Sequence, residues 1–330
     1  MKPSKPPVCL RVTEPTMPAH NHHFLSQCYL RGFTDNGSKK SKLIGIDRQT
    51  GKSFPTTPRN VGSLRDFNRI EAEGIDPDAL ENSLSEFETG AALGLRALAE
   101  GAKFEGEVLD NVLTLAGLLH VRSPARREQW RKFQASIAER IMDLTLATPE
   151  RWESQLRQMR EAGQEPKGDT SYETAKKFFD SKAYTIDVAR EHHIRMEFVS
   201  LDAVMPFLME RRWLLLEATA DTGPFVTSDH PVNLSWKEPE SVPLFYRDHP
   251  GHGMKETRVW FPVSKNLGMI GEFDGREGRH PATKQTVAAM NSMTISFSQR
   301  QFYAPNLGFP IVGPSGEIRD GRHLLNALRR

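Results

Sequence analysis

The chain has 330 residues, of which 38 % are hydrophobic, so it can bury the core of one large domain or of two modest ones. Its two cysteines, Cys9 and Cys28, form neither a disulfide framework nor a zinc-binding spacing, which favours a reducing compartment. The net charge of +2 excludes the strongly basic footprint of a dedicated nucleic-acid binder, so any such binding must come from a local patch.

Residues 1–19 are rich in proline and lack the continuous apolar core of a secretory signal, so we expect a flexible tail. No segment approaches the roughly 20 apolar residues that a membrane-spanning helix needs. We therefore expect a cytoplasmic protein that does not enter a membrane, with residues 20–330 forming a single domain.

The first predicted element after the tail is a two-stranded ribbon, since apolar residues 42–47 and 52–54 flank a short loop that ends in Gly51. A helical part follows, from about residue 76 to about residue 211. Asp76 can cap its first helix, in which apolar side chains recur at spacings of three and four as far as Leu98. The next helix, about 107–120, is apolar nearly all round and should lie at the centre of the core.

Pro124 permits a new helix after Ser123, and this helix has a regular apolar stripe that we expect to face the core. The stripe consists of Trp130, Phe133, Ile137, Ile141 and Leu144. Further helices are predicted from residue 149 to 163, from 171 to 181 after a polar linker, from 186 to 199, and in a short segment ending near Arg211.

From residue 212 the pattern changes to short apolar runs bounded by Pro, Gly and Asp, at 213–216, 224–227 and 258–263, which predict strands. Residues 237–257 form a long loop that is either a lid or disordered. A helix over 283–298 and a strand over 301–304 end the pattern. The predicted fold class is α+β, with a central helical bundle, a short N-terminal hairpin and a small, mostly antiparallel C-terminal sheet.

The first candidate site is the pair His22 and His23, because a neutral imidazole can ligate a metal or act as a base near pH 7. Gln27 and Arg31 follow closely and could bind an anion or orient a substrate oxygen. Adjacent side chains diverge in a helix or a strand, so the two imidazoles act together only on an irregular backbone. The alternative is that both rings bond backbone carbonyls and cap the following segment.

The second candidate is the segment Thr227-Ser228-Asp229-His230-Pro231, just past a predicted strand. Its carboxylate and imidazole could join His22 or His23 around a metal. The alternative is a turn, in which the aspartate accepts backbone N–H bonds.

The third candidate is a group of arginines at the start of the helix after Ser123, with Arg122 and Arg126 four positions apart, as are Arg127 and Arg131. They could hold a phosphate. The alternative is a solvated helix flank. We expect no function from His249 and His252 in the long loop.

Three motifs resemble a known bacterial family. They are Asn21-His22-His23 with an aromatic residue after it, Tyr29-Leu30-Arg31-Gly32-Phe33, and the loop segment from Ile46 to Lys52. With the Arg122-Ser123-Pro124 element and the Thr227–Pro231 turn, they are similar to the family called domain of unknown function 4238, over nearly the whole chain after the tail. One position departs from the family pattern, where Ser26 stands in place of the usual proline. The resemblance indicates where a site lies and implies no activity.

The sequence favours a divalent-metal-dependent hydrolase of a phosphate-containing substrate, for example a nucleic acid, a nucleotide or another phosphorylated small molecule. In this hypothesis His22, His23 and Asp229 are catalytic, and His23, Asp229 and His230 bind the metal. The substrate-binding residues are Gln27, Arg31, Arg122, Arg126 and Ser228. The alternatives are a non-catalytic nucleotide- or protein-binding regulatory module and an abortive-infection or toxin-like protein. The hypothesis requires the segments around His22 and Asp229 to meet at a shared polar cavity.

Overall fold

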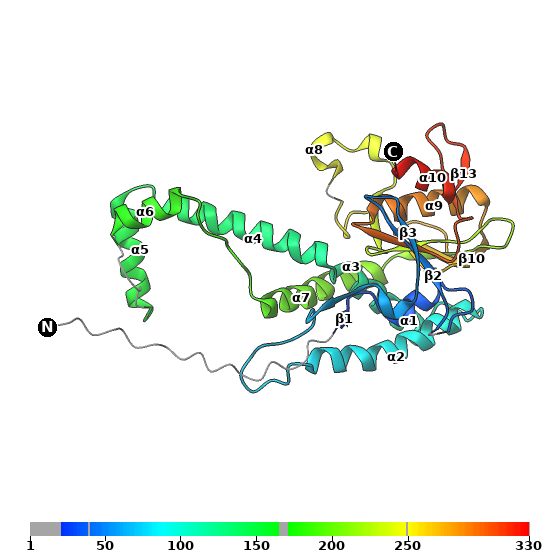
Figure 1. Cartoon of the computed structure of the whole chain (residues 1–330), viewed down its shortest axis with the longest axis horizontal. Helices are drawn as coiled ribbons and strands as arrows, with labels where there is room; N and C mark the ends of the chain where they lie inside the picture. The colour runs from blue at the N-terminus through cyan, green and yellow to red at the C-terminus, as the bar shows by residue number, and fades with distance from the viewer. Residues whose placement is uncertain (1–20, 39, 165–170, 249, 330) are drawn as a thin grey trace.

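A computed structural model describes residues 21–38, 40–164, 171–248 and 250–329. The predicted tail and most of the predicted linker after residue 163 lie outside these residues. Within them the chain mixes helices with several small sheets, which confirms the predicted α+β class. Figure 1 shows a body that contains the sheets, from which α4, α5 and α6 extend as an arm.

The helices agree closely with the predicted helical part and add short ones elsewhere. They are α1 (Gln27–Arg31), α2 (Ala79–Ala99), α3 (Gly106–Val121), α4 (Pro124–Thr145), α5 (Pro149–Glu161), α6 (Tyr172–Asp180), α7 (Arg190–Met209), α8 (Leu244–Arg247), α9 (Lys284–Phe297) and α10 (Gly321–Leu328), with single 3-10 turns η1 (Pro58–Asn60) and η2 (Pro239–Ser241).

The largest sheet in the described residues has the strand order β10-β5-β9-β8-β7, with only the outer pair β10 and β5 parallel. Its strands are β5 (Arg212–Glu217), β7 (Asn233–Trp236), β8 (Thr257–Ser264), β9 (Leu267–Glu272) and β10 (Gly278–Pro281). Two-stranded sheets pair β1 (Asn21–His23) with β4 (Ser63–Arg65) and β12 (Pro310–Val312) with β13 (Ile318–Asp320).

The predicted ribbon is confirmed as the antiparallel pair β2 (Leu43–Asp47) and β3 (Ser53–Thr56). It belongs to a four-stranded sheet of order β3-β2-β11-β6, in which β11 (Gln301–Ala304) lies between β2 and β6 (Thr227–Ser228). The N-terminal hairpin and the C-terminal third of the chain therefore share one sheet.

Helix α3 lies between α2 and α7, as its apolar surface predicted. A Cβ added at Gly117 would come within 2.7 Å of the Leu201 side chain, so this glycine lets α3 and α7 approach closely. The two helices predicted around residues 186–211 are one continuous helix, α7, because no Pro or Gly interrupts residues 199–204. The arm in Figure 1 means that the predicted central bundle is not formed by all the helices.

The prediction that the apolar stripe of α4 faces the core is wrong. No side chain of this fully described helix is buried, and Phe133 and Leu144 are 54 % and 58 % exposed. The helix projects from the body, with contacts to α7 through Arg127 and Gln134 and with α5 as its neighbour at the outer end (Figure 1). Periodicity predicted the helix and its stripe, but the partner of a stripe depends on the rest of the fold.

No helix among the described residues is both long enough and apolar enough to cross a bilayer.

Candidate functional site

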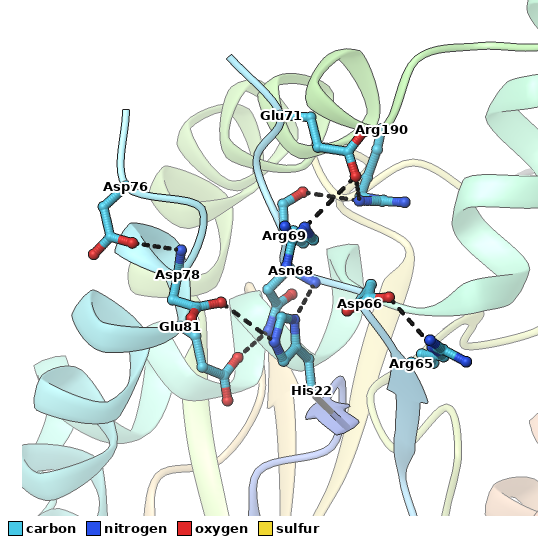
Figure 2. A network of polar contacts seen from close by, with 10 residues as sticks. All are labelled: His22, Arg65, Asp66, Asn68, Arg69, Glu71, Asp76, Asp78, Glu81 and Arg190. Carbon is cyan, nitrogen blue, oxygen red and sulfur yellow. Dashed lines mark hydrogen bonds and ion pairs between the residues drawn. The ribbon is translucent and has the colours of Figure 1, made fainter. Parts of the chain in front are cut away.

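The two N-terminal histidines are engaged in local contacts. His22 is buried, and its Nδ1 accepts a hydrogen bond of 2.9 Å from the backbone N–H of Asn68, while its Nε2 lies 3.9 Å from an oxygen of Asp78. Figure 2 shows the ring enclosed by Asn68, Asp78 and Glu81. The Nε2 of His23 donates to the carbonyl of Arg59 at 3.3 Å. The alternative expected from sequence was that both rings bond backbone carbonyls: His23 does so, whereas His22 accepts from a backbone N–H.

Arg122 belongs to a buried network of charges behind this pair. Its guanidinium donates to the Asn68 side chain at 2.7 Å and lies 3.6 Å from the Glu197 carboxylate. Arg127 binds the same carboxylate through two nitrogens, at 2.5 and 3.2 Å, and Asn68 donates onward to Glu81 at 2.6 Å. Each buried charge thus has a partner of opposite charge, and the network joins α2, α3, α4 and α7.

Asp229 acts as a clamp for the start of β11. Its two carboxylate oxygens accept backbone N–H bonds from Gln299, Arg300 and Gln301 at 2.7, 2.7 and 2.9 Å. Burial raises the pKa of this carboxyl, and the three bonds oppose that rise. The Ser228 hydroxyl accepts from the His230 backbone N–H at 3.1 Å, so the segment has the hydrogen bonding of a turn.

The predicted metal ligands are not brought together. Within the described part of the chain, no group of three or more His, Cys, Asp or Glu side chains is placed to hold a metal ion, so His23, Asp229 and His230 form no such set. Gln27 and Arg31 lie in α1 and do not line the groove described below.

Three imidazoles do meet, and one of them is the predicted ligand His230. His120 at the end of α3 and His230 after β6 have ring centroids 5.6 Å apart, and His120 and His252 have centroids 4.6 Å apart. A guanidinium nitrogen of Arg126 lies 3.3 Å from the His120 Nε2. Of this cluster the sequence singled out only His230 and Arg126. A signal for His120 was present, since it is the polar residue in a run from Leu115 to Val121 that is otherwise apolar.

The hydrogen bonds of the cluster define where the ring protons lie. The Nδ1 of His120 is 3.1 Å from the Val232 carbonyl, which can only accept, so this nitrogen carries the hydrogen and Nε2 is an acceptor. The Nε2 of His252, 3.0 Å away, must then donate to it, which leaves the His252 Nδ1 as a bare acceptor, buried and without a partner. No side-chain hydrogen bond joins either ring nitrogen of His230 to the described residues, and its Nδ1 is buried.

Burial also decides the charge of the cluster. It lowers the pKa of His230 to about 4, with the positive charge of Arg126 acting in the same direction. It lowers the pKa of His252 to about 4, assisted by Arg211 and Arg126, and holds the pKa of His120 well below its usual value. All three rings are therefore neutral at pH 7 and able to accept a proton.

The cluster lines a groove that crosses the first turn of α4. Its middle pocket, of about 500 Å³, includes His120, Arg126, His230 and Gln299. It shares His120 and Arg126 with a pocket of about 420 Å³ that extends to Trp130, Phe133 and His252. On the other side it shares Ser123, Ala125 and Gln299 with a pocket of about 400 Å³ that extends to Phe24, Phe54 and Tyr303. We call these three pockets the α4 groove.

The segments around His22 and Asp229 do adjoin, since the Tyr29 hydroxyl lies 2.7 Å from the Thr227 hydroxyl. Phe24 and Asp229 line the same end of the α4 groove. His23 instead lines a separate cavity of only about 10 Å³. The meeting of the two segments therefore contributes to the groove without bringing the His22 and His23 rings into it.

These features define an α+β protein with a polar groove at the start of a projecting helix. Residues 21–306 match the model of the family described as "Protein of unknown function (DUF4238)", and the chain belongs to that family, as its motifs indicated. No curated protein and no solved structure matches the chain.

Proposed function

We propose that the α4 groove binds a phosphate ester and cleaves it by proton transfer through its histidines, which makes the protein a phosphodiester hydrolase. The single observation that carries this proposal is His230. The residue is only 7 % exposed and its ring has no hydrogen-bond partner among the described residues, yet it lines the groove beside Arg126. A buried polar ring without a partner costs stability and is often retained for function.

The first turn of α4 supplies the anion-binding part. The Ser123 hydroxyl caps the helix by accepting from the Arg126 N–H at 3.2 Å, whereas the Ala125 N–H has no partner in the described structure and its residue lines the groove. A helix start presents such free N–H groups together with the positive end of the helix dipole. At this helix start Pro124 has no N–H, and the N–H groups of Arg126 and Arg127 are bonded to Ser123. The Ala125 N–H and the Arg126 guanidinium therefore form the site for one phosphate.

The imidazoles supply the proton-transfer part. His230 is neutral and can accept a proton, and the His120–His252 pair has two facing Nε2 atoms that share one hydrogen. A phosphate held nearby favours the charged form of an imidazole, so the pair can take up a second proton once substrate binds. The residues do not fit a metal site, and no step depends on one.

A second candidate is a phosphate-binding module without catalysis. The low pKa of His230 and His252, about 4 in each case, favours it, because an imidazole with such a pKa is a weak base in the free protein. Both candidates use the same phosphate site, and they differ in turnover.

The test uses the full chain, with inorganic phosphate as the binding probe and bis(4-nitrophenyl) phosphate as a generic diester. We expect Arg126→Ala to weaken phosphate binding about tenfold through loss of a charged hydrogen bond. We expect His230→Gln to lower the hydrolysis rate by a factor of about 100 with little change in phosphate binding. Arg140→Ala, at an exposed position on the same helix, is the matched control.

Phosphate binding without cleavage of this diester, or of a diester that carries its own neighbouring hydroxyl as nucleophile, would favour the binding module over the hydrolase. An Arg126→Ala variant that binds phosphate as well as Arg140→Ala does would contradict both candidates.

A further inference from the structure

The α4 groove continues past the phosphate position in both directions, and each end is aromatic. One end holds Phe24, Phe54 and Tyr303 in a pocket of about 400 Å³. The other holds Trp130 and Phe133, whose rings meet edge to face with centroids 5.9 Å apart, in a pocket of about 420 Å³. Each volume is ample for one planar heterocycle, and each end is lined by aromatic side chains.

The order of groups along the groove is aromatic, cationic, aromatic. The middle pocket, with Ala125 and Arg126, shares residues with both ends, so a phosphate bound there would have an aromatic pocket on either side. Asn60 and Arg300 at one end, and Gln129 and Ser200 at the other, add polar groups that can reach a base edge. Proteins bind unpaired nucleotides by this combination of a charged track and stacking platforms.

The partial burial of the two aromatic ends favours an unpaired strand. Trp130, Phe24 and Phe54 are half-buried at the walls of pockets, so a base must leave a duplex stack to reach them. The net charge of +2 also fits a local contact with a few nucleotides better than a long duplex footprint.

The acid and base groups of the groove favour RNA over DNA as the substrate. A diester that carries its own nucleophile beside the phosphorus can be cleaved by one base and one acid, and in RNA the neighbouring 2′-hydroxyl is that nucleophile. We propose that the α4 groove binds single-stranded RNA, with one phosphate at the start of α4 and a base in each aromatic pocket. This inference rests on the proposed phosphodiester hydrolase and names its substrate.

The step balances without a further reactant. The 2′-oxygen forms a bond to phosphorus as its proton passes to His230, and the bond from phosphorus to the 5′-oxygen breaks. The protonated His120–His252 pair donates a proton to that leaving oxygen. The products are a strand that ends in a 2′,3′-cyclic phosphate and a strand that begins with a 5′-hydroxyl, and proton exchange with water restores the histidines.

The test measures binding by fluorescence anisotropy. One short mixed sequence is labelled in three forms: single-stranded RNA, single-stranded DNA and duplex RNA. Cleavage of each form is then followed. We expect the single-stranded RNA to bind more tightly than the duplex. We expect Trp130→Ala to weaken the binding of single-stranded RNA about tenfold. Trp130→Phe should restore much of the affinity. Phe178→Ala, which removes an exposed ring on α6 far along the arm, should have no effect. Thermal unfolding of each variant checks that it folds.

Cleavage gives a second and independent readout. The RNA should yield cyclic-phosphate ends, and a 2′-O-methyl group at every sugar should abolish cleavage while binding persists. DNA cut as fast as RNA, or RNA binding that Trp130→Ala leaves unchanged, would overturn the RNA assignment while the hydrolase proposal stands. If inorganic phosphate fails to compete and Arg126→Ala changes nothing, the phosphate site itself is refuted.

Discussion

The Nε2 atoms of His120 and His252 lie 3.0 Å apart although 132 positions separate the two residues in the chain. Arg211 makes this contact possible. Its guanidinium donates to the carbonyls of His252, Thr257 and Gly271 at 2.8, 2.8 and 3.1 Å, and so fastens the loop after α8 to the main sheet.

Arg211→Lys should release this loop. A lysine cannot reproduce the planar set of donors, and we expect a loss of about 2 kcal/mol in unfolding free energy together with faster proteolysis of residues 248–257. The next residue offers a matched control, since Arg212 is exposed and Arg212→Lys should change neither quantity. Equal proteolysis rates in the two variants would show that Arg211 does not hold the loop.

The neutral histidines predict an acid-sensitive fold. Burial lowers the pKa of His230 and of His252 to about 4, below the ordinary histidine value of 6.5, so between these pH values the unfolded chain binds more protons than the folded one. Stability is therefore fully present above about pH 6.5 and is lost as the pH falls towards 4.

Each of the two histidines should change the free energy of unfolding by up to about 1.4 kcal/mol per pH unit between pH 6.5 and pH 4. Urea unfolding at pH 7, 6 and 5 measures the slope. His230→Phe removes one titrating group and should flatten it, whereas His323→Phe, at an exposed position in α10, should not. A slope that is the same in both variants would contradict the burial of a neutral His230.

The buried network around Glu197 should be stabilising only as a complete unit. Glu197→Gln leaves Arg122 and Arg127 without their shared carboxylate, and we expect it to cost about 3 to 5 kcal/mol. Asp202→Asn removes a carboxylate from an exposed position on the same helix and should cost less than about 0.5 kcal/mol. Chemical denaturation of both variants measures their free energies of unfolding. Similar losses in the two variants would refute a stabilising role of the Glu197 network.

A variant of Asp229 tests whether this residue is catalytic, as expected from sequence, or whether it only holds the start of β11 through its hydrogen bonds. Asp229→Asn replaces one accepting oxygen by an NH₂ group that faces backbone donors, and we expect a loss of about 2 kcal/mol in stability. At temperatures where the variant is folded, its hydrolysis rate should fall much less than that of His230→Gln. A variant with full stability and no activity would favour the catalytic role.

Much of the local structure could be predicted because its determinants lie within a few residues. Gly51, at a φ of 62°, closes the predicted hairpin, and the Ser123 hydroxyl caps α4 with Pro124 in its first turn. Turn chemistry was likewise readable at Ser228, whose hydroxyl accepts from the His230 N–H, whereas the Asp229 carboxylate binds backbone 70 positions away at the start of β11, which no local pattern shows.

Tertiary structure alone decided which of these elements meet. The stripe that includes Phe133 and Leu144 is equally regular whether it faces a core or solvent, so periodicity could not show that α4 projects from the body. The long loop could be read only as a lid or as disordered, because its anchor, Arg211, precedes His252 by 41 positions. A sequence specifies helices, turns and caps through short-range sterics and hydrogen bonds, whereas a site assembled from α3, α4, the β6–β7 turn and a distant loop depends on long-range packing.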